Sequence, residues 1–188
     1  MQIERLGIPE VLLLTPHRFT DPRGFVSESF RHRRLAEAGI TLDFVQENDS
    51  FSRRAGTVRG LHAQHEPSVQ GKLVRVVKGA IFDVAVDARH GSPTFGHHAS
   101  AELTWENGRQ LWIPPGFLHG FCTLAPDTLV IYKMTTEYDP SAECGALWND
   151  PGLAIPWPIA PEHAVLSDKD RVRPPLAECP AWFTVPKA

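Results

Sequence analysis

The chain has 188 residues and a mass of 20.9 kDa, which suits one domain with a sizeable core. Hydrophobic residues make up 42% and charged residues 22% of the chain, so its composition excludes a disordered or fibrous protein. The net charge of −3 argues against a nucleic-acid-binding protein, because such proteins usually carry a basic surface. The 17 prolines disfavour a helical bundle and favour short strands joined by many turns.

The N-terminal segment and the cysteines bear on location. Residues 1–14 carry charges at three of the first ten positions and an apolar run of only four, too short for the hydrophobic part of a signal peptide. The longest stretch without charge, residues 110–126, is broken by two prolines and a glycine and is shorter than the ~20 apolar residues that cross a bilayer. The 3 cysteines lack a CxxC pattern, so we expect neither a disulfide framework nor a thiolate zinc site. These features predict a cytoplasmic protein with no membrane segment.

In chain order, the sequence predicts one helix and many short strands. The helix is expected over residues 31–38, with Ser29 as a possible N-cap and Gly39 ending it. Segments rich in apolar and β-branched residues, bounded by turn residues, predict strands. These are expected at residues 11–14, 57–64, 72–77, 80–87, 101–104, 110–113, 120–123 and 129–135. The turn at residues 78–79 predicts that its two flanking strands form a hairpin.

The number and spacing of these strands predict the fold class. Many short strands at such intervals are typical of an antiparallel β-sandwich or barrel of the jelly-roll type, here with one or a few short helices. No internal repeat or linker divides the chain, so we expect a single domain over residues 1–175. The proline-containing end, residues 176–188, is expected to be an extended arm of the same domain.

The second and third predicted strands carry polar residues that could do chemistry. Alternation places His62 on one face with Gly60 and Gln64, whereas Arg59 and Leu61 either point the other way or lie at the mouth of the strand. If the first face lines a barrel, His62 is an imidazole in a partly dry cavity. Lys72 begins an apolar strand, where its amine either reaches past the strand end to water or has a polar partner.

Three later positions have both a structural and a chemical interpretation. His119 follows a stiff Pro-Pro-Gly turn, where a lone histidine more often makes a structural hydrogen bond. Tyr132 lies within an apolar strand and would ordinarily fill the core with its hydroxyl hydrogen-bonded. The charged segment 166–170 would ordinarily be a solvated loop.

The segment PPGFLH (residues 114–119) has the pattern PxGxxH and resembles half of the cupin signature, which raises the question of a metal site. Metal-binding cupins present two histidines as HxH, then a glutamate and a later histidine, a set that suits an octahedral metal. Here the HxH position has His62 followed by Gln64, and the strand that would supply the acidic ligand has Lys72. Because a fixed cation repels a metal ion, we expect a cupin-type barrel with no metal, in which acid–base chemistry replaces metal chemistry.

A larger set of motifs resembles the dTDP-4-dehydrorhamnose 3,5-epimerase family. The motifs run in order over about residues 1–175, and so many ordered motifs make chance similarity implausible. They are DPRGF (21–25), ESF (28–30), QEN (46–48), RGLH (59–62), QGKLV (70–74), DVAVD (83–87), SPTFG (92–96), PPGFLHGF (114–121), YK (132–133), WNDP (148–151) and LSDKD (166–170).

The resemblance implies an epimerase that uses no cofactor. Members of this family convert dTDP-4-keto-6-deoxy-D-glucose into dTDP-4-keto-L-rhamnose by inverting carbons 3 and 5, in dTDP-L-rhamnose biosynthesis. By the same resemblance, His62 is expected to be the base and Asp170 the carboxylate that orients its imidazole. Tyr132 is expected to be the acid, and Lys72 is expected to stabilise the enolate at the ketone oxygen.

The resemblance also implies a set of substrate contacts. Tyr138 is expected to stack on thymine, whereas Arg23 and Arg59 can bond phosphate oxygens bidentately. Glu143 and Lys169 could equally be exposed surface charges. The full set of expected substrate contacts is Arg23, Glu28, Gln46, Asn48, Arg59, His119, Tyr138, Glu143 and Lys169.

Family members are homodimers whose N-terminal strands cross to the partner, so Arg23 and Glu28 are expected at the neighbouring subunit's site. Ala63 departs from the family, which often has an aromatic residue there, and we expect altered packing rather than lost catalysis. A related epimerase that inverts only one carbon is the alternative. A metal-dependent cupin oxygenase and a non-catalytic cupin that only binds nucleotide sugars are competing hypotheses from other classes.

Overall fold

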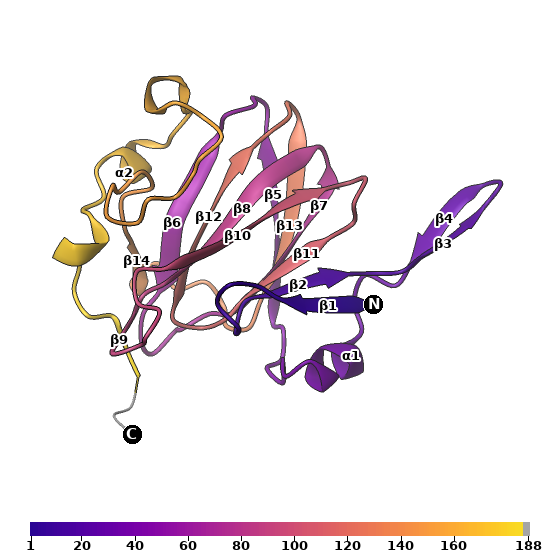
Figure 1. The fold of residues 1–188 in the computed structure, drawn as a ribbon, viewed down its shortest axis with the longest axis horizontal. Helices are drawn as coiled ribbons and strands as arrows, with labels where there is room; N and C mark the ends of the chain where they lie inside the picture. Colours follow the sequence, from indigo (N-terminus) through magenta and orange to yellow (C-terminus); the bar gives the residue numbers. More distant parts are fainter. Residues whose placement is uncertain (186–188) are drawn as a thin grey trace.

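Two antiparallel sheets form most of the computed structural model, which describes residues 1–185 (Figure 1). The six-stranded sheet has the order β1 (Gln2–Arg5), β2 (Leu12–Thr15), β11 (Gln110–Ile113), β7 (Lys72–Lys78), β13 (Thr128–Met134), β5 (Gln46–Ser52). The five-stranded sheet has the order β10 (His98–Thr104), β8 (Ala80–Asp87), β12 (Phe117–Thr123), β6 (Val58–Gln64), β14 (Glu143–Gly145). The predicted antiparallel all-β fold of jelly-roll type is confirmed.

The remaining elements are short and lie outside the two sheets. A hairpin of β3 (Arg18–Asp21) and β4 (Gly24–Ser27) projects away from the sandwich (Figure 1). The helices are α1 (His32–Glu37) and α2 (Asp168–Arg171), with 3₁₀ turns at Pro161–His163 and Leu176–Glu178. Within residues 1–185, no helix is long and apolar enough to cross a membrane.

Alternation along the strands separates the core between the sheets from a second apolar layer. Val74 and Val76 of β7 meet Ala85 of β8 and Phe121 of β12 in the cluster between the sheets. The opposite face of the five-stranded sheet is apolar as well, and the segment that follows β14 covers it (Figure 1). Both faces of this sheet are therefore buried, which explains why its strands are almost continuously apolar.

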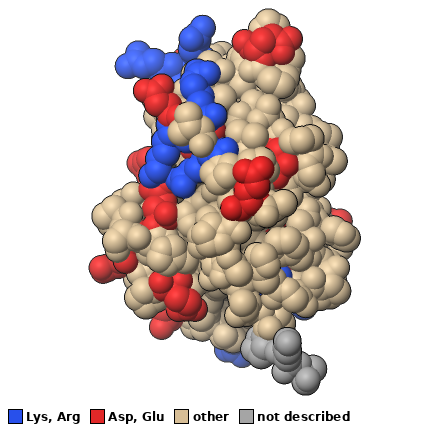
Figure 2. All heavy atoms as spheres, turned by 90° about the vertical axis from the view of Figure 1, so that its left-hand side faces the viewer, with Lys and Arg blue, Asp and Glu red and all other residues tan. Residues whose placement is uncertain are grey.

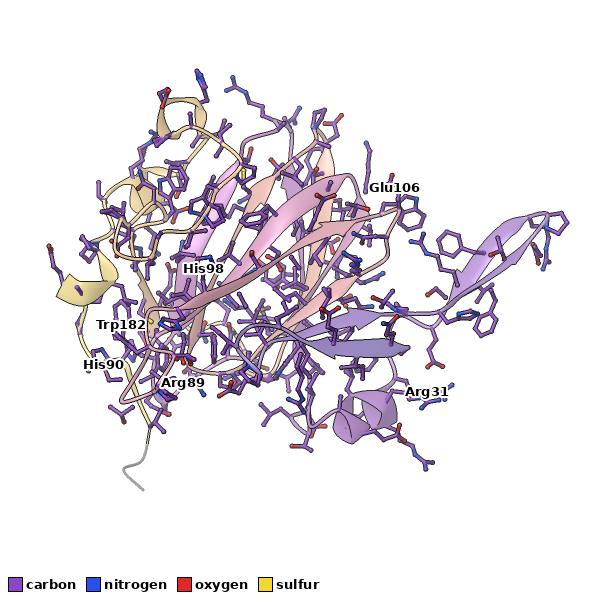
Figure 3. The ribbon with its side chains drawn as sticks, viewed as in Figure 1. Arg31, Arg89, His90, His98, Glu106 and Trp182 are labelled. Carbon is purple, nitrogen blue, oxygen red and sulfur yellow. The ribbon has the colours of Figure 1, made fainter. Side chains whose placement is uncertain are left out.

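The C-terminal segment belongs to this second layer. Leu176 and Phe183 are buried against the five-stranded sheet, and β15 (Phe183–Thr184) pairs in parallel with β9 (Arg89–His90). Arg89, His90 and Trp182 lie together at this end of the molecule (Figure 3). Residues 186–188 of the predicted arm lie outside the described residues.

Two local predictions were wrong. Strands β7 and β8 do not pair as a hairpin, because the chain crosses from one sheet to the other at Gly79. Gly79 has a φ of 81°, and a Cβ there would collide with the side chain of Thr128. A tight glycine turn can join strands of facing sheets as readily as strands of one sheet. Ser29 is not the N-cap of α1, since Arg31 occupies that position without a side-chain capping bond.

Candidate active site

A cleft between the two sheets gathers most of the predicted site residues. It consists of two adjoining hollows of about 330 Å³ and 280 Å³. His62 enters the cleft from β6 of the five-stranded sheet, whereas Lys72 and Tyr132 enter from β7 and β13 of the six-stranded sheet. Asp170 approaches from α2, and Ser167 is the N-cap residue of that helix. The residues common to both hollows are His62, Lys72, Tyr132, Ser167 and Asp170.

A bulge in β6 brings Arg59 to the same cleft as His62. His62 pairs with His119 and Arg59 with Phe121, so three steps along β6 face two steps along β12. The extra residue breaks the period of two, so of the two placements expected for Arg59, the one that points away from His62 was wrong. Gly60, at φ 123°, makes this close approach possible, since a Cβ there would lie 2.5 Å from the Cα atom of Gly120.

His62 and Asp170 form a close pair in the cleft. The Nε2 atom of His62 lies 2.5 Å from the Oδ1 atom of Asp170, whose side chain is buried. Asp170 is held by α2, which begins after Ser167, and the Ser167 hydroxyl accepts a hydrogen bond from the Asp170 backbone N–H. Burial raises the pKa of Asp170, but the hydrogen bond and charge of His62, together with hydrogen bonds from Ser167 and Gly60, leave this pKa below its usual value. Segment 166–170 is therefore not a solvated loop.

Lys72 is buried inside the cleft rather than reaching past the strand end to bulk water. Its Nζ atom lies 3.4 Å from the backbone oxygen of His62. Burial lowers the pKa of Lys72 to about 8, so its ammonium can lose a proton near neutral pH. Lys72 thus brings its amine to the cleft that the imidazole of His62 also lines.

Tyr132 lies across the cleft from His62. It belongs to β13, where it pairs with Val74 of β7 and Asn48 of β5, and it is half-buried. An imidazole on one sheet and a phenol on the other can reach opposite sides of a molecule held between them.

A second histidine–carboxylate pair includes His119, which lines the smaller hollow. The Nε2 atom of His119 is 2.7 Å from the Oδ1 atom of Asp83, and both side chains are buried. Within residues 1–185, the other carboxylate oxygen of Asp83 has no hydrogen-bond partner. Burial raises the pKa of Asp83. Asp83 begins the DVAVD motif, but sequence reasoning gave it no role, although a carboxylate within an apolar strand was a usable signal.

The larger hollow ends in a polar cluster around Glu143. One carboxylate oxygen accepts a hydrogen bond from the Tyr138 hydroxyl at 3.0 Å. The other oxygen is 2.5 Å from Nζ of Lys169 and 2.6 Å from Nη2 of Arg173. Burial raises the pKa of Glu143, but the hydrogen bonds from Lys169 and Tyr138 leave it below its usual value. Glu143 and Lys169 line the cleft and are not isolated surface charges. Arg173 was missed by sequence reasoning because no motif covers it.

Two amide side chains support this end of the cleft from β5. The Oε1 atom of Gln46 accepts a hydrogen bond from the Tyr138 backbone N–H at 2.7 Å, and its Nε2 atom donates to Asn48 at 2.9 Å. Asn48 lines the larger hollow.

Arg23 and Glu28 lie away from the cleft of their own chain. Arg23 is at the turn of the β3–β4 hairpin, where its side chain is 88% exposed and pairs only locally with Asp21. Glu28 pairs with Arg31 near the base of the hairpin. Arg31 is on the opposite side of the molecule from α2 (Figure 3).

The described chain offers no cluster suited to a metal ion: in residues 1–185, no three His, Cys, Asp or Glu side chains gather closely enough. On the face that carries α2, Lys and Arg side chains gather at the upper end, with acidic side chains among them (Figure 2). This end of the molecule therefore offers cations to an anionic ligand.

Comparison with known proteins is consistent with these features. The family model described as dTDP-4-dehydrorhamnose 3,5-epimerase matches residues 5–178. A protein of that name from Sinorhizobium fredii is 50% identical over 183 residues, covering 97% of this chain and 93% of the relative.

Two solved structures are also similar. The dTDP-6-deoxy-D-glucose-3,5-epimerase of Legionella pneumophila, in complex with dTDP-4-keto-L-rhamnose, is 43% identical with a TM-score of 0.93, covering 100% of this chain and 99% of that one. A 3'-monoepimerase of Streptomyces bikiniensis, in complex with dTDP-quinovose, is 32% identical with a TM-score of 0.84, covering 92% of this chain and 86% of that one. The chain therefore belongs to the dTDP-4-dehydrorhamnose 3,5-epimerase family.

Proposed function

We propose that this protein is an epimerase that inverts carbons 3 and 5 of dTDP-4-keto-6-deoxy-D-glucose to give dTDP-4-keto-L-rhamnose. The observation that carries the proposal is the arrangement of His62, Lys72 and Tyr132 around one cleft, with base and acid candidates on facing sheets. The names of the similar proteins indicate the same reaction.

The reaction needs a base because carbons 3 and 5 both flank the ketone. Since Nε2 of His62 faces Asp170, the other ring nitrogen is free to accept a proton from carbon 3 or 5. The electron pair of the broken C–H bond then moves to the ketone oxygen as an enolate. Asp170 stabilises the imidazolium that forms, as a carboxylate does behind other catalytic histidines.

The second half of each inversion needs an electrophile and an acid. The Lys72 ammonium stabilises the negative charge on the enolate oxygen in a site of low dielectric constant. Tyr132 donates its hydroxyl proton to the opposite face of the same carbon, and solvent restores both proton carriers. No cofactor enters this scheme.

The nucleotide part of the substrate has its own group of contacts. We assign the diphosphate to Arg59, and the thymine ring to Tyr138, which is exposed at the far end of the larger hollow. Glu143, Lys169, Gln46, Asn48 and His119 complete the site within one chain.

We further propose a cytoplasmic homodimer in which the β3–β4 hairpin reaches the partner. Phe19 and Val26 on this hairpin are exposed, which is typical of a surface that another chain covers. Arg23 and Glu28 would then contribute to the partner's site. Mixing Arg23→Ala with His62→Ala subunits tests this: a heterodimer would regain one complete site, whereas sites built from single chains would show no recovery.

The reaction itself is tested in heavy water. Incubation with dTDP-4-keto-6-deoxy-D-glucose should place deuterium at carbons 3 and 5 of an L-configured product, read by NMR. Label at one carbon alone would instead establish an epimerase that inverts a single carbon. The similarity to the Streptomyces bikiniensis monoepimerase is the reason to test this alternative. Stoichiometric transition metal bound at His62 and His119 would favour the oxygenase hypothesis. Binding without turnover would favour a non-catalytic cupin.

A further inference from the structure

The segment that carries α2 is fastened to the five-stranded sheet at two points. Asp170 contacts His62 on β6, and Arg173, three residues later, contacts Glu143 on β14. Strands β6 and β14 are neighbours in the sheet, with Gly145 paired to His62. The two contacts are therefore close in space as well as in sequence.

Arg173 sits in a place shaped to hold it. Its side chain is 16% exposed and that of Glu143 is 14% exposed, so this ion pair is largely shielded from water. The guanidinium packs close to Gly145, where a Cβ would be in van der Waals contact with the Arg173 Cζ atom at 3.4 Å and would collide with the backbone oxygen of Leu61. The next residue, Pro174, accepts a hydrogen bond from the Leu147 backbone N–H at 2.8 Å, which fixes the main chain.

Glu143 links Arg173 to the nucleotide end of the cleft. The carboxylate oxygen that Arg173 does not contact accepts the hydrogen bond from the Tyr138 hydroxyl. A carboxylate held from one side by a guanidinium has a fixed direction for its second oxygen. Lys169 also contacts Glu143, but its side chain is mostly exposed and its flexible amine constrains the carboxylate less.

We propose that Arg173 is a positioning residue that holds the Glu143 carboxylate toward Tyr138 and so shapes the nucleoside-binding end of the cleft. This inference rests on the proposed function, in which Tyr138 contacts thymine. Arg173 is not among the residues that line the two hollows of the cleft, so it would act through Glu143 on binding rather than on proton transfer.

The test compares Arg173→Met, which removes the charge, with Arg173→Lys, which keeps it. Arg171→Met is the matched control, because Arg171 is exposed in the same segment. We expect Arg173→Met to weaken dTDP binding, measured by calorimetry, and to raise KM by about tenfold, with kcat changed by less than about threefold. Arg173→Lys should recover part of the loss, and Arg171→Met should behave as the unaltered protein.

A double-mutant cycle separates this role from general stabilisation. In the Glu143→Gln background, Arg173→Met should add little to the loss of dTDP affinity, because both changes remove the same contact. Losses that multiply, or an unchanged dTDP affinity in soluble Arg173→Met protein, would overturn the proposal. A fall in kcat at constant dTDP affinity would also overturn it and indicate action through Asp170. Failure of the unaltered protein to bind dTDP would instead refute the proposed function, and this inference with it.

Discussion

The Nε2 atom of His62 lies 2.5 Å from the Oδ1 atom of Asp170, although the two residues are 108 positions apart in the chain. A strand of one sheet and a short helix far along the chain meet there, so the pair exists only in the folded protein. This relationship decides which ring nitrogen of His62 faces the cleft.

Replacing Asp170 with asparagine keeps the shape but removes the charge that stabilises a protonated His62. We expect Asp170→Asn to lower kcat by ~10²–10⁴ while leaving dTDP affinity within about twofold. Steady-state kinetics and calorimetry measure the two quantities. Asp168→Asn is the control, since Asp168 is exposed in the same helix and its change should leave kcat intact. Equal losses in both variants would show that the helix, and not the pair, matters.

Tyr132→Phe should still allow removal of a proton from the substrate but should impair completed inversion. Without the hydroxyl, His62 can still exchange protons with solvent at the substrate's α-carbons, but no acid delivers a proton to the opposite face. We expect product formation to fall by ~10²–10⁴ while deuterium uptake into unchanged substrate falls much less. NMR in heavy water follows both. Full turnover by this variant would show that Tyr132 is not the acid.

The buried Lys72 predicts an activity that declines in alkaline solution. Its pKa is lowered to about 8 by burial, so the charge that stabilises the enolate is present below pH 8 and is lost above it. We expect kcat to fall as the pH rises through about 8. Lys72→Met should be slow at every pH and lack this decline; an unchanged alkaline limb in that variant would assign it to another group.

The pH dependence of stability should be opposite to that of activity: as the pH rises, Lys72 should make the free energy of unfolding larger. Between pH 8 and 10.5 the unfolded chain binds the Lys72 proton more tightly than the folded protein does, so raising the pH favours folding. Urea titrations at pH 8 and pH 10 should therefore show the stability of the unaltered protein rising relative to that of Lys72→Met. A constant difference between the two proteins would contradict the burial of a charged amine.

Asp87 is expected to stabilise the fold without taking part in the chemistry. Its buried carboxylate accepts hydrogen bonds from Arg89, Ser92 and Thr94. Burial raises its pKa, but these bonds outweigh burial and lower the pKa to about 2. The stabilisation, about 2 kcal/mol by linkage, is present above the unfolded pKa of ~3.9 and is lost as the pH falls toward 2.

Asp87→Asn should lower the free energy of unfolding at pH 7 by about 2 kcal/mol, with activity per folded molecule unchanged. Urea titrations between pH 7 and pH 3 should show the difference from the unaltered protein shrinking with acidity. Asp43→Asn is the control, because the exposed Asp43 pairs with His32 at 3.4 Å and should contribute less than about 1 kcal/mol. A pH-independent loss would mean that the asparagine disturbs packing.

Sequence patterns predicted the strands that are apolar and bounded by turns. The strand expected at residues 110–113 has the observed bounds, since its four residues are all buried and a Pro-Pro-Gly turn follows. In contrast, β1 was missed because Gln2–Arg5 is an exposed edge strand whose side chains carry no apolar pattern. Which sheet a strand joins depends on distant partners, so the pairing of β7 and β8 was predicted wrongly.

Some residues of the candidate site could likewise be predicted from sequence patterns, whereas others could not. His62, Lys72 and Tyr132 stood out because polar residues interrupt apolar strands, and the structure brings them to one cleft. Arg173 had no such signal, because a charged residue in a proline-rich segment looks like surface. Its burial results from the way that segment folds over the sheet, which no local pattern encodes.

The β6 bulge limits how much the distance between Arg59 and His62 can change. Arg59 and His62 are three residues apart in one strand, so relative motion of the two sheets would leave their separation nearly constant while it changed the reach of Tyr132. A ketosugar joined to its nucleoside through one phosphate, or through three, would then present its ring out of register with the imidazole. The bulge in β6 would therefore let the site select the length of the phosphate linker as well as the nucleobase.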